Sequence, residues 1–327
     1  MIITRTPLRV SFAGGGTDLP SFYRAEGYGA VLSTTIKRFM YIVIHPYFHR
    51  KLRIKYSQTE DVSSIDEIQH PIVRECLRKL DIGKGVEIAS FSDVPAGTGL
   101  GSSSAFTIGL LHALYCYKGI SVSKERLAQD ACEVEIEILG EPIGKQDQYA
   151  SAYGGLNYFR FNDDESVEVQ PLDLSDNQAD FLESTLSLNF VGGHRSAGEI
   201  LGRIRAGLDS QSQREHLLAI REHVAEAREE IKHSDRPNLG PVLSKGWEVK
   251  KKLDDGVSSQ NIEEGFSRAG GRDLMGGKLL GAGGAGFLLL QHGRTDSLAK
   301  IFSTDHISFE FDKMGTMVFI TKKNRLN

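Results

Sequence analysis

The segment Pro95-Ala96-Gly97-Thr98-Gly99-Leu100-Gly101-Ser102-Ser103-Ser104 decides how this chain is interpreted. The stretch 85–91 before it predicts a strand, and the apolar stretch 104–117 after it predicts a buried helix. Glycines let a backbone approach an anion closely, and a helix start offers unpaired N–H groups at the positive end of the helix dipole. No lysine follows the last glycine, so this is not a Walker A loop. The alternative is an ordinary Gly/Ser helix cap, which three spaced glycines and three serines disfavour.

We therefore predict a phosphate-binding loop. Its members are Pro95, Gly97, Gly99, Leu100, Gly101, Ser102, Ser103 and Ser104.

Composition narrows the class of protein. The 327 residues are 40% hydrophobic and 25% charged, which is typical of a folded globular chain of one large or two smaller domains. The net charge of -4 comes without a basic run, so binding of nucleic acid or of membranes through bulk charge is not expected. The N-terminus lacks a signal-peptide pattern, and no apolar stretch approaches the roughly 20 residues of a membrane span. We expect a cytoplasmic enzyme.

Strands and helices are mixed along the chain without a repeating βαβ rhythm, which predicts an α+β fold. The character changes near residue 180, so we predict two domains, 1–180 and 181–327, with the active site in the cleft between them. Helices are expected over 66–80, 104–117, 123–139, 196–208, 213–233, 240–254 and 260–274. Strands are expected over 8–12, 40–44, 85–91, 154–161, 186–191 and, as two short ones, 309–321.

A second glycine-rich segment, Gly281-Ala282-Gly283-Gly284-Ala285-Gly286, satisfies the dinucleotide-binding pattern G-x-G-x-x-G. That pattern requires a strand before it and a helix after it. Here we expect a helix before it and an apolar strand after it, so a dehydrogenase is a weak alternative. The glycines instead indicate that this backbone passes close to a ligand or to the other glycine loop.

Two acidic residues point to chemistry. On a helical wheel for 126–139, Glu135 lies in the apolar stripe, whereas Asp130, Glu133 and Glu137 lie on the polar face. A buried carboxylate needs a cationic partner, which is either a basic side chain or Mg²⁺ carried by ATP. Asp147 follows the end of this helix, and its position is equally consistent with a turn residue and with a general base that takes a hydroxyl proton.

Three segments in this order, 7–18, 95–105 and 279–286, resemble the motifs of the GHMP kinases, and the resemblance covers essentially the whole chain. It implies a two-domain α+β fold with ATP in the cleft. It also implies that Ser104 and Glu135 are Mg²⁺ ligands and that Asp147 is the catalytic base. Arg9 would orient the accepting hydroxyl, and Asp18 would bind sugar hydroxyls. We assign further acceptor contacts to Gly15, Gly16, Thr17, Lys145, Gly283 and Gly284.

Within that family, the segments 13–20 and 141–149 resemble the D-glycero-D-manno-heptose 7-phosphate kinases, which phosphorylate an anomeric hydroxyl. Ala13 to Asp18 departs from the Gly-Glu-His-Thr-Asp of galactokinases, and fucokinases are the nearest rival. A substrate that carries a phosphate needs a cationic pocket, so we expect Arg195 to contact it; the alternative is a surface ion pair. A catalytically silent sugar- or nucleotide-binding protein is disfavoured because Arg9, Ser104, Glu135 and Asp147 are all present.

Overall fold

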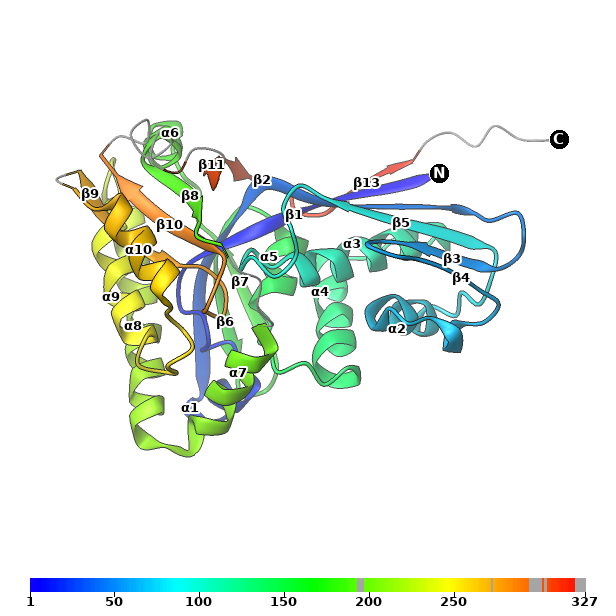
Figure 1. Ribbon diagram of the computed structural model, residues 1–327, viewed down its shortest axis with the longest axis horizontal. Helices are drawn as coiled ribbons and strands as arrows, with labels where there is room; N and C mark the ends of the chain where they lie inside the picture. Colours follow the sequence, from blue (N-terminus) through cyan, green and yellow to red (C-terminus); the bar gives the residue numbers. More distant parts are fainter. Residues whose placement is uncertain (193–196, 272, 294–301, 303–304, 321–327) are drawn as a thin grey trace.

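The computed structural model describes residues 1–192, 197–271, 273–293, 302 and 305–320. Within them the chain forms two β-sheets with helices packed against both (Figure 1). This mixture confirms the predicted α+β class. None of the described helices has the length and apolar character needed to cross a membrane.

The larger sheet has nine strands, in the order β13-β1-β2-β5-β3-β4, while β6 and β12 pair with β2, and β7 pairs with β6. Its members are β1 Ile2–Ala13, β2 Tyr28–Pro46, β3 Leu52–Lys55, β4 Thr59–Val62, β5 Val86–Ser92, β6 Leu156–Asn162, β7 Val167–Pro171, β12 Phe311–Asp312 and β13 Met317–Ile320. The last two strands come from the end of the described chain, yet they pair with β2 and β1. The larger sheet is therefore completed by residues from beyond the boundary predicted near 180.

The smaller sheet has four antiparallel strands in the order β11-β8-β10-β9. They are β8 Leu186–Phe190, β9 Leu274–Leu279, β10 Phe287–His292 and β11 His306–Ser308. Figure 1 shows α9 Gly240–Lys250 and α10 Gln260–Ala269 along this sheet, with α8 Gln211–His233 beside α9. Trp247 and Phe302 belong to the apolar cluster on this side of the molecule.

The remaining helices surround the larger sheet and the space between the sheets. They are α1 Pro20–Glu26, α2 Pro71–Lys79, α3 Ser102–Tyr117, α4 Lys124–Cys132, α5 Gln146–Tyr153, α6 Asp176–Thr185 and α7 Ala197–Ala206, with 3₁₀ turns at Ile65–Glu67 and Gly207–Asp209. α3 packs on β1 and β2 and is buried along most of its length, which explains why its sequence is apolar nearly all round. It is the central helix of the larger apolar core.

Several expected helices have different limits in the structure; the one expected over 240–254, for example, ends at Lys250. The helix expected over 66–80 begins at Pro71, because proline fits the first turn of a helix and not its interior. The helix expected over 123–139 is α-helical only to Cys132 and continues as a π-helical segment, Glu133–Ile138. The helix expected over 260–274 ends at Ala269, and β9 follows. A strand, not a helix, therefore precedes Gly281; a strand also follows it, so the dinucleotide-binding context still fails.

Candidate active site

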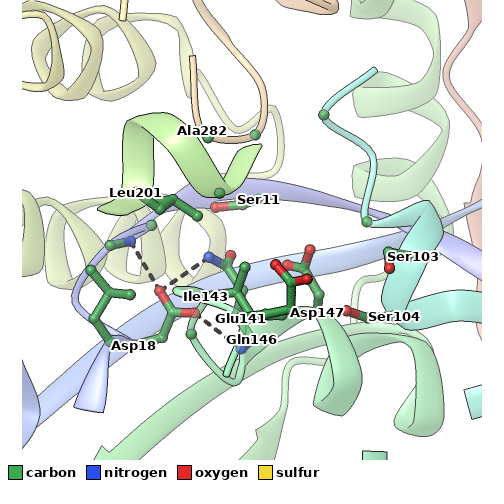
Figure 2. Close-up of a pocket in the computed structure, with 18 of the residues that line it drawn as sticks. Ser11, Asp18, Ser103, Ser104, Glu141, Ile143, Gln146, Asp147, Leu201 and Ala282 are labelled. Carbon is green, nitrogen blue, oxygen red and sulfur yellow. Dashed lines mark hydrogen bonds between the residues drawn. The ribbon is translucent and has the colours of Figure 1, made fainter. Parts of the chain in front are cut away.

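A cavity of about 350 Å³ lies where the three glycine-rich segments meet. Figure 2 shows Asp18 and Gln146 at one end, Ser103 and Ser104 at the other, and Asp147 between them. Glycines from each segment line it: Gly15, Gly16, Gly97, Gly99, Gly101, Gly281 and Gly283. Segments far apart in the sequence thus form one site.

The glycine–serine loop, residues 95–104, leads directly into the N-terminus of α3. Gly101 caps this helix in the left-handed conformation, with φ of 74°, which favours glycine. A side chain there would also lie 3.0 Å from Arg9 Cγ and 3.1 Å from Asp147 Oδ2. The first N–H groups of a helix have no partner within it, so the start of α3 offers donors to an anion in the cavity.

The third glycine segment packs against this loop. A Cβ on Gly99 would lie 2.5 Å from the carbonyl oxygen of Leu280, and one on Gly281 would lie 2.5 Å from Gly99 Cα. The Phe287 N–H donates to the carbonyl of Thr98 at 3.3 Å. The expectation that the Gly281–Gly286 backbone passes close to the other glycine loop is confirmed.

Glu135 lies on the π-helical segment and is 1% exposed, as its place on the apolar stripe predicted. Its Oε2 accepts from Gln148 Nε2 at 2.7 Å, and its Oε1 accepts from Ser103 Oγ at 3.1 Å. Burial raises the pKa of Glu135 to about 7, because the hydrogen bonds it accepts only partly offset its desolvation. No lysine or arginine among the described residues forms an ion pair with it.

These oxygens suit a hard divalent cation. Besides Glu135, the Ser104 hydroxyl lies in the cavity lining, and the buried Oε1 of Gln148 has no hydrogen-bond partner in the described structure. The described residues hold no cluster of three or more histidine, cysteine, aspartate or glutamate side chains able to bind a metal alone. The site therefore fits an ion that takes most of its ligands from a bound polyanion and from water.

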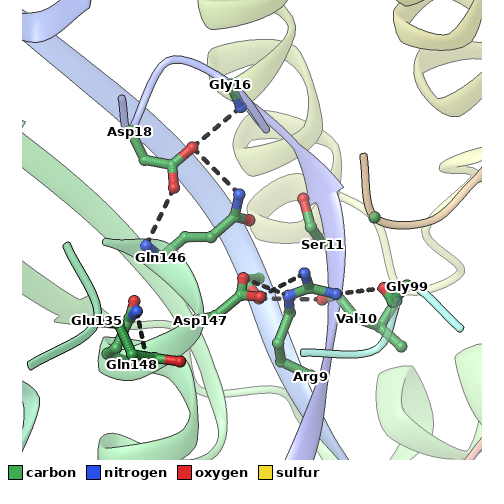
Figure 3. A network of polar contacts seen from close by, with 12 residues as sticks. Arg9, Val10, Ser11, Gly16, Asp18, Gly99, Glu135, Gln146, Asp147 and Gln148 are labelled. Atoms are coloured by element: carbon green, nitrogen blue, oxygen red, sulfur yellow. Dashed lines mark hydrogen bonds and ion pairs between the residues drawn. The ribbon is translucent and has the colours of Figure 1, made fainter. Parts of the chain in front are cut away.

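Arg9 and Asp147 form a bidentate ion pair at the centre of the site (Figure 3). Arg9 Nε donates to Asp147 Oδ1 and Arg9 Nη2 to Asp147 Oδ2, both at 2.7 Å. Arg9 also anchors the glycine–serine loop, since its Nη1 donates to the carbonyl of Gly99 at 2.5 Å and its backbone N–H to the carbonyl of Leu100 at 3.0 Å. The pair fixes the carboxylate in one orientation and leaves lone pairs for a hydroxyl in the cavity.

Asp18 closes the opposite end. Its Oδ1 accepts from the N–H of Gly16 at 3.0 Å and from Gln146 Nε2 at 3.1 Å, and its Oδ2 accepts from the N–H of Gln146 at 3.1 Å (Figure 3). Burial raises the pKa of Asp18, and the nearby Asp147 adds to this. Gln146, which the sequence analysis did not single out, therefore binds both oxygens of Asp18 through its backbone and side-chain amides.

Most of the predicted residues line one cavity. These are Arg9, Gly15, Gly16, Asp18, Gly97, Gly99, Gly101, Ser102, Ser103, Ser104, Glu135, Asp147 and Gly283. Pro95, Leu100, Thr17, Lys145 and Gly284 do not line it. Arg195 lies outside the described residues.

The residues outside the lining have other contacts. Thr17 is fully buried and its hydroxyl donates to the carbonyls of Gly14 and Ala30 at 2.8 Å, which fixes the first glycine loop. Lys145 is directed away from the site: its ammonium donates to Glu165 Oε2 at 2.6 Å and lies 5.1 Å from the centre of the Tyr23 ring. The Lys145 side chain, only 12% exposed, therefore supports the loop before α5 and does not line the cavity.

Two basic residues of the lining were missed. Lys250 ends α9 and Lys278 lies on β9. Lys278 directly precedes the third glycine segment, and this position was the one signal in the sequence that could have placed Lys278 in the site. Lys250 gave none, because a lysine at the C-terminal turn of a helix is ordinary.

Several known proteins are similar to this chain in sequence. The family model "GHMP kinases N terminal domain" matches residues 69–155. A D-glycero-alpha-D-manno-heptose 7-phosphate kinase of Campylobacter jejuni is 30% identical over 302 residues, which is 88% of each chain. An L-fucokinase/L-fucose-1-P guanylyltransferase of Bacteroides fragilis is 27% identical over 88% of this chain, but over only 34% of its own length.

Solved structures show the same architecture. A D-glycero-D-manno-heptose 1-phosphate kinase from Bacteroides thetaiotaomicron superposes with a TM-score of 0.81 at 24% identity, covering 98% of this chain and all of the other. A putative sugar kinase from Campylobacter jejuni gives a TM-score of 0.76 at 27% identity, covering 97% and 98%.

Proposed function

Since the chain belongs to the GHMP kinase family and is an ATP-dependent phosphotransferase, we propose that its acceptor is the anomeric hydroxyl of D-glycero-D-manno-heptose 7-phosphate. The product would be the 1,7-bisphosphate. The observation that carries the proposal is the Arg9–Asp147 pair, which lies between the phosphate loop and the Asp18 end of a single cavity. The 30% identity to a heptose 7-phosphate kinase over most of both chains supports this acceptor.

In the proposed reaction, Asp147 accepts the proton of the sugar hydroxyl while the hydroxyl oxygen forms a bond to the γ-phosphorus of ATP. The bond from that phosphorus to the β,γ-bridging oxygen breaks, and ADP leaves. Arg9 holds the Asp147 carboxylate in place, and the N–H groups at the start of α3 bind the phosphates. Asp18 and the glycines beside it orient the sugar.

Ser104 and Glu135 are the residues that would hold Mg²⁺. When bound, the ion would neutralise negative charge on the phosphates during transfer. The fit rests on a buried carboxylate without a basic partner among the described residues, together with nearby hydroxyl and amide oxygens. The assignment of Gly15, Gly16 and Gly283 to acceptor contacts also stays a prediction.

The base assignment is tested by Asp147→Asn. The amide retains the shape of the carboxylate but does not accept a proton, so kcat should fall on the order of 1,000-fold while ATP affinity changes little. Single-turnover kinetics and ATP titration measure the two quantities. Near-normal turnover would remove Asp147 from the proposed role.

The acceptor is tested by an ADP-release screen over heptose 7-phosphate, mannose 6-phosphate, fucose, galactose and mevalonate, with the phosphorylated position assigned by NMR. The relatives include a fucokinase, so fucose is the second candidate. Preferred turnover of an unphosphorylated sugar would overturn the proposed acceptor without affecting the assignment as a kinase. No ADP release with any acceptor would favour a silent binding protein.

A further inference from the structure

Two lysines in the cavity wall have no carboxylate partner among the described residues. Lys278 is 9% exposed, and its Nζ donates to the carbonyls of Ser11 at 3.0 Å and Phe12 at 3.3 Å. Lys250 is half-buried, and its Nζ donates to the carbonyl of Gly281. Both side chains therefore end on neutral backbone oxygens.

This arrangement is costly in the absence of an anion. Burial, together with the positive charge of Arg9, lowers the pKa of Lys250 to about 8, and the negative charge of Asp18 offsets only part of this. Burial also lowers the pKa of Lys278, with added repulsion from Lys250 and Arg9. Within the described part of the chain, Arg9 is the only one of these three cations in direct contact with a carboxylate, that of Asp147. A bound anion would remove this penalty.

A third polar group supports an anion at this place. Ser11 lines the cavity and is 6% exposed, and its hydroxyl has no hydrogen-bond partner in the described structure. A buried hydroxyl without a partner is unfavourable unless a ligand completes it. Ser11 and Lys278 thus present donors from adjoining parts of the same wall.

We propose that Lys250, Lys278 and Ser11 bind the phosphate that the acceptor sugar carries before the reaction. The proposal rests on the proposed function and names the subsite that would select a phosphorylated sugar. Lys278 is hydrogen-bonded to the end of β1 that leads into the Gly15–Asp18 loop. The proposed function assigns this end of the cavity to the acceptor. The phosphates of ATP have separate donors, the N–H groups of the loop and of the start of α3.

The test compares Lys278→Met and Lys250→Met with the wild type. Methionine keeps the length and apolar stem of lysine and removes the charge, so the folded state should persist, as circular dichroism would verify. KM for heptose 7-phosphate should rise about 10- to 100-fold, because charge-assisted hydrogen bonds to the phosphate are lost. KM for ATP, and kcat/KM for the unphosphorylated heptose, should change less than about threefold.

Lys245→Met is the matched control. Lys245 lies on the same helix as Lys250, is 56% exposed and pairs with Glu226 at 2.8 Å outside the cavity. It should leave all three constants unchanged. Equal losses for phosphorylated and unphosphorylated acceptors, or a rise confined to KM for ATP, would overturn the proposal; the second result would assign the lysines to the nucleotide.

A binding measurement separates failure of the subsite from failure of the proposed acceptor. Inorganic phosphate should raise the melting temperature of the wild type and of Lys245→Met, but not that of the Lys250→Met/Lys278→Met double variant. This holds even if no heptose is turned over. An equal shift in all three proteins would mean that the lysines do not form a phosphate site.

Discussion

Asp130 and Glu135 lie five residues apart in neighbouring helical segments, and both are 1% exposed, yet their surroundings differ. Asp130 forms ion pairs with Lys79 and with Arg126, both at 3.0 Å, and accepts from the Tyr115 hydroxyl at 2.5 Å. Glu135 accepts from neutral groups alone among the described residues. A buried carboxylate with its own cations stabilises the fold, whereas one without them is available to a cation that arrives with a ligand.

The sharpest test of this contrast is Glu135→Gln. If Glu135 binds the ion that accompanies ATP, loss of its charge should lower kcat/KM on the order of 1,000-fold, while the isosteric amide leaves the fold intact. Steady-state kinetics across a range of Mg²⁺ concentrations measure the effect. Glu133→Gln is the control, because Glu133 lies two residues away, has a side chain that is 44% exposed and pairs with Lys79. Similar activity in Glu135→Gln and Glu133→Gln would contradict the proposed role of Glu135 in binding the ion.

The pH dependence of stability gives the next largest effect. The pKa of Glu135 is about 7 in the folded chain, against 4.5 when unperturbed. The folded state therefore retains a proton that the unfolded chain has released. The stability contributed by this group is fully present below pH 4.5 and is lost as the pH rises through 7.

Relative to wild type, Glu135→Gln should gain stability between pH 4.5 and pH 8, by on the order of 3 kcal/mol without metal or nucleotide. Urea unfolding of both proteins at the two pH values measures this difference in the free energy of unfolding. The contributions of all other titratable groups cancel between variant and wild type. A difference that does not change with pH would contradict the burial of an unpaired carboxylate.

Asp130→Asn should give the smallest effect, and it should lower stability and leave activity unchanged. It should lower the free energy of unfolding by about 2 kcal/mol, because Lys79 keeps its contact with Glu133 and Arg126 is more than half exposed. Its kcat/KM should stay at the wild-type value. Lost activity at unchanged stability would instead give Asp130 a functional role.

Asp130 and Glu135 also show how much helical periodicity can predict about burial. It predicted correctly that Glu135 is buried, because an α-helical wheel holds up to Cys132 and the π-helical turn shifts the following residues only gradually. It was wrong for Asp130, which the wheel placed on the polar face. Lys79 comes from α2 and Tyr115 from α3, and these helices cover that face. Such a contact is set by packing, which a single helix does not encode.

Glycine spacing carried the most information about the site. The left-handed conformations of Gly99, Gly101 and Gly281, and the close approach of the two loops, leave no room for a side chain. The sequence therefore marked the loops directly. Lys145 does not line the cavity, because proximity along the chain to Asp147 does not fix the direction of a side chain, and Glu165 and Tyr23 attract its ammonium.

By itself the sequence determined the α+β class, the glycine–serine loop at the start of α3, the buried Glu135 and the kinase family, since each depends on local backbone geometry or on motifs in order. Only the tertiary structure decided that Arg9 binds both carboxylate oxygens of Asp147, that Gln146 binds Asp18, and that Lys278, hydrogen-bonded to the Ser11 carbonyl, faces the same cavity as Lys250. These contacts join residues up to 267 positions apart. Their energies depend on distance and burial, which arise only when the sheets and helices pack.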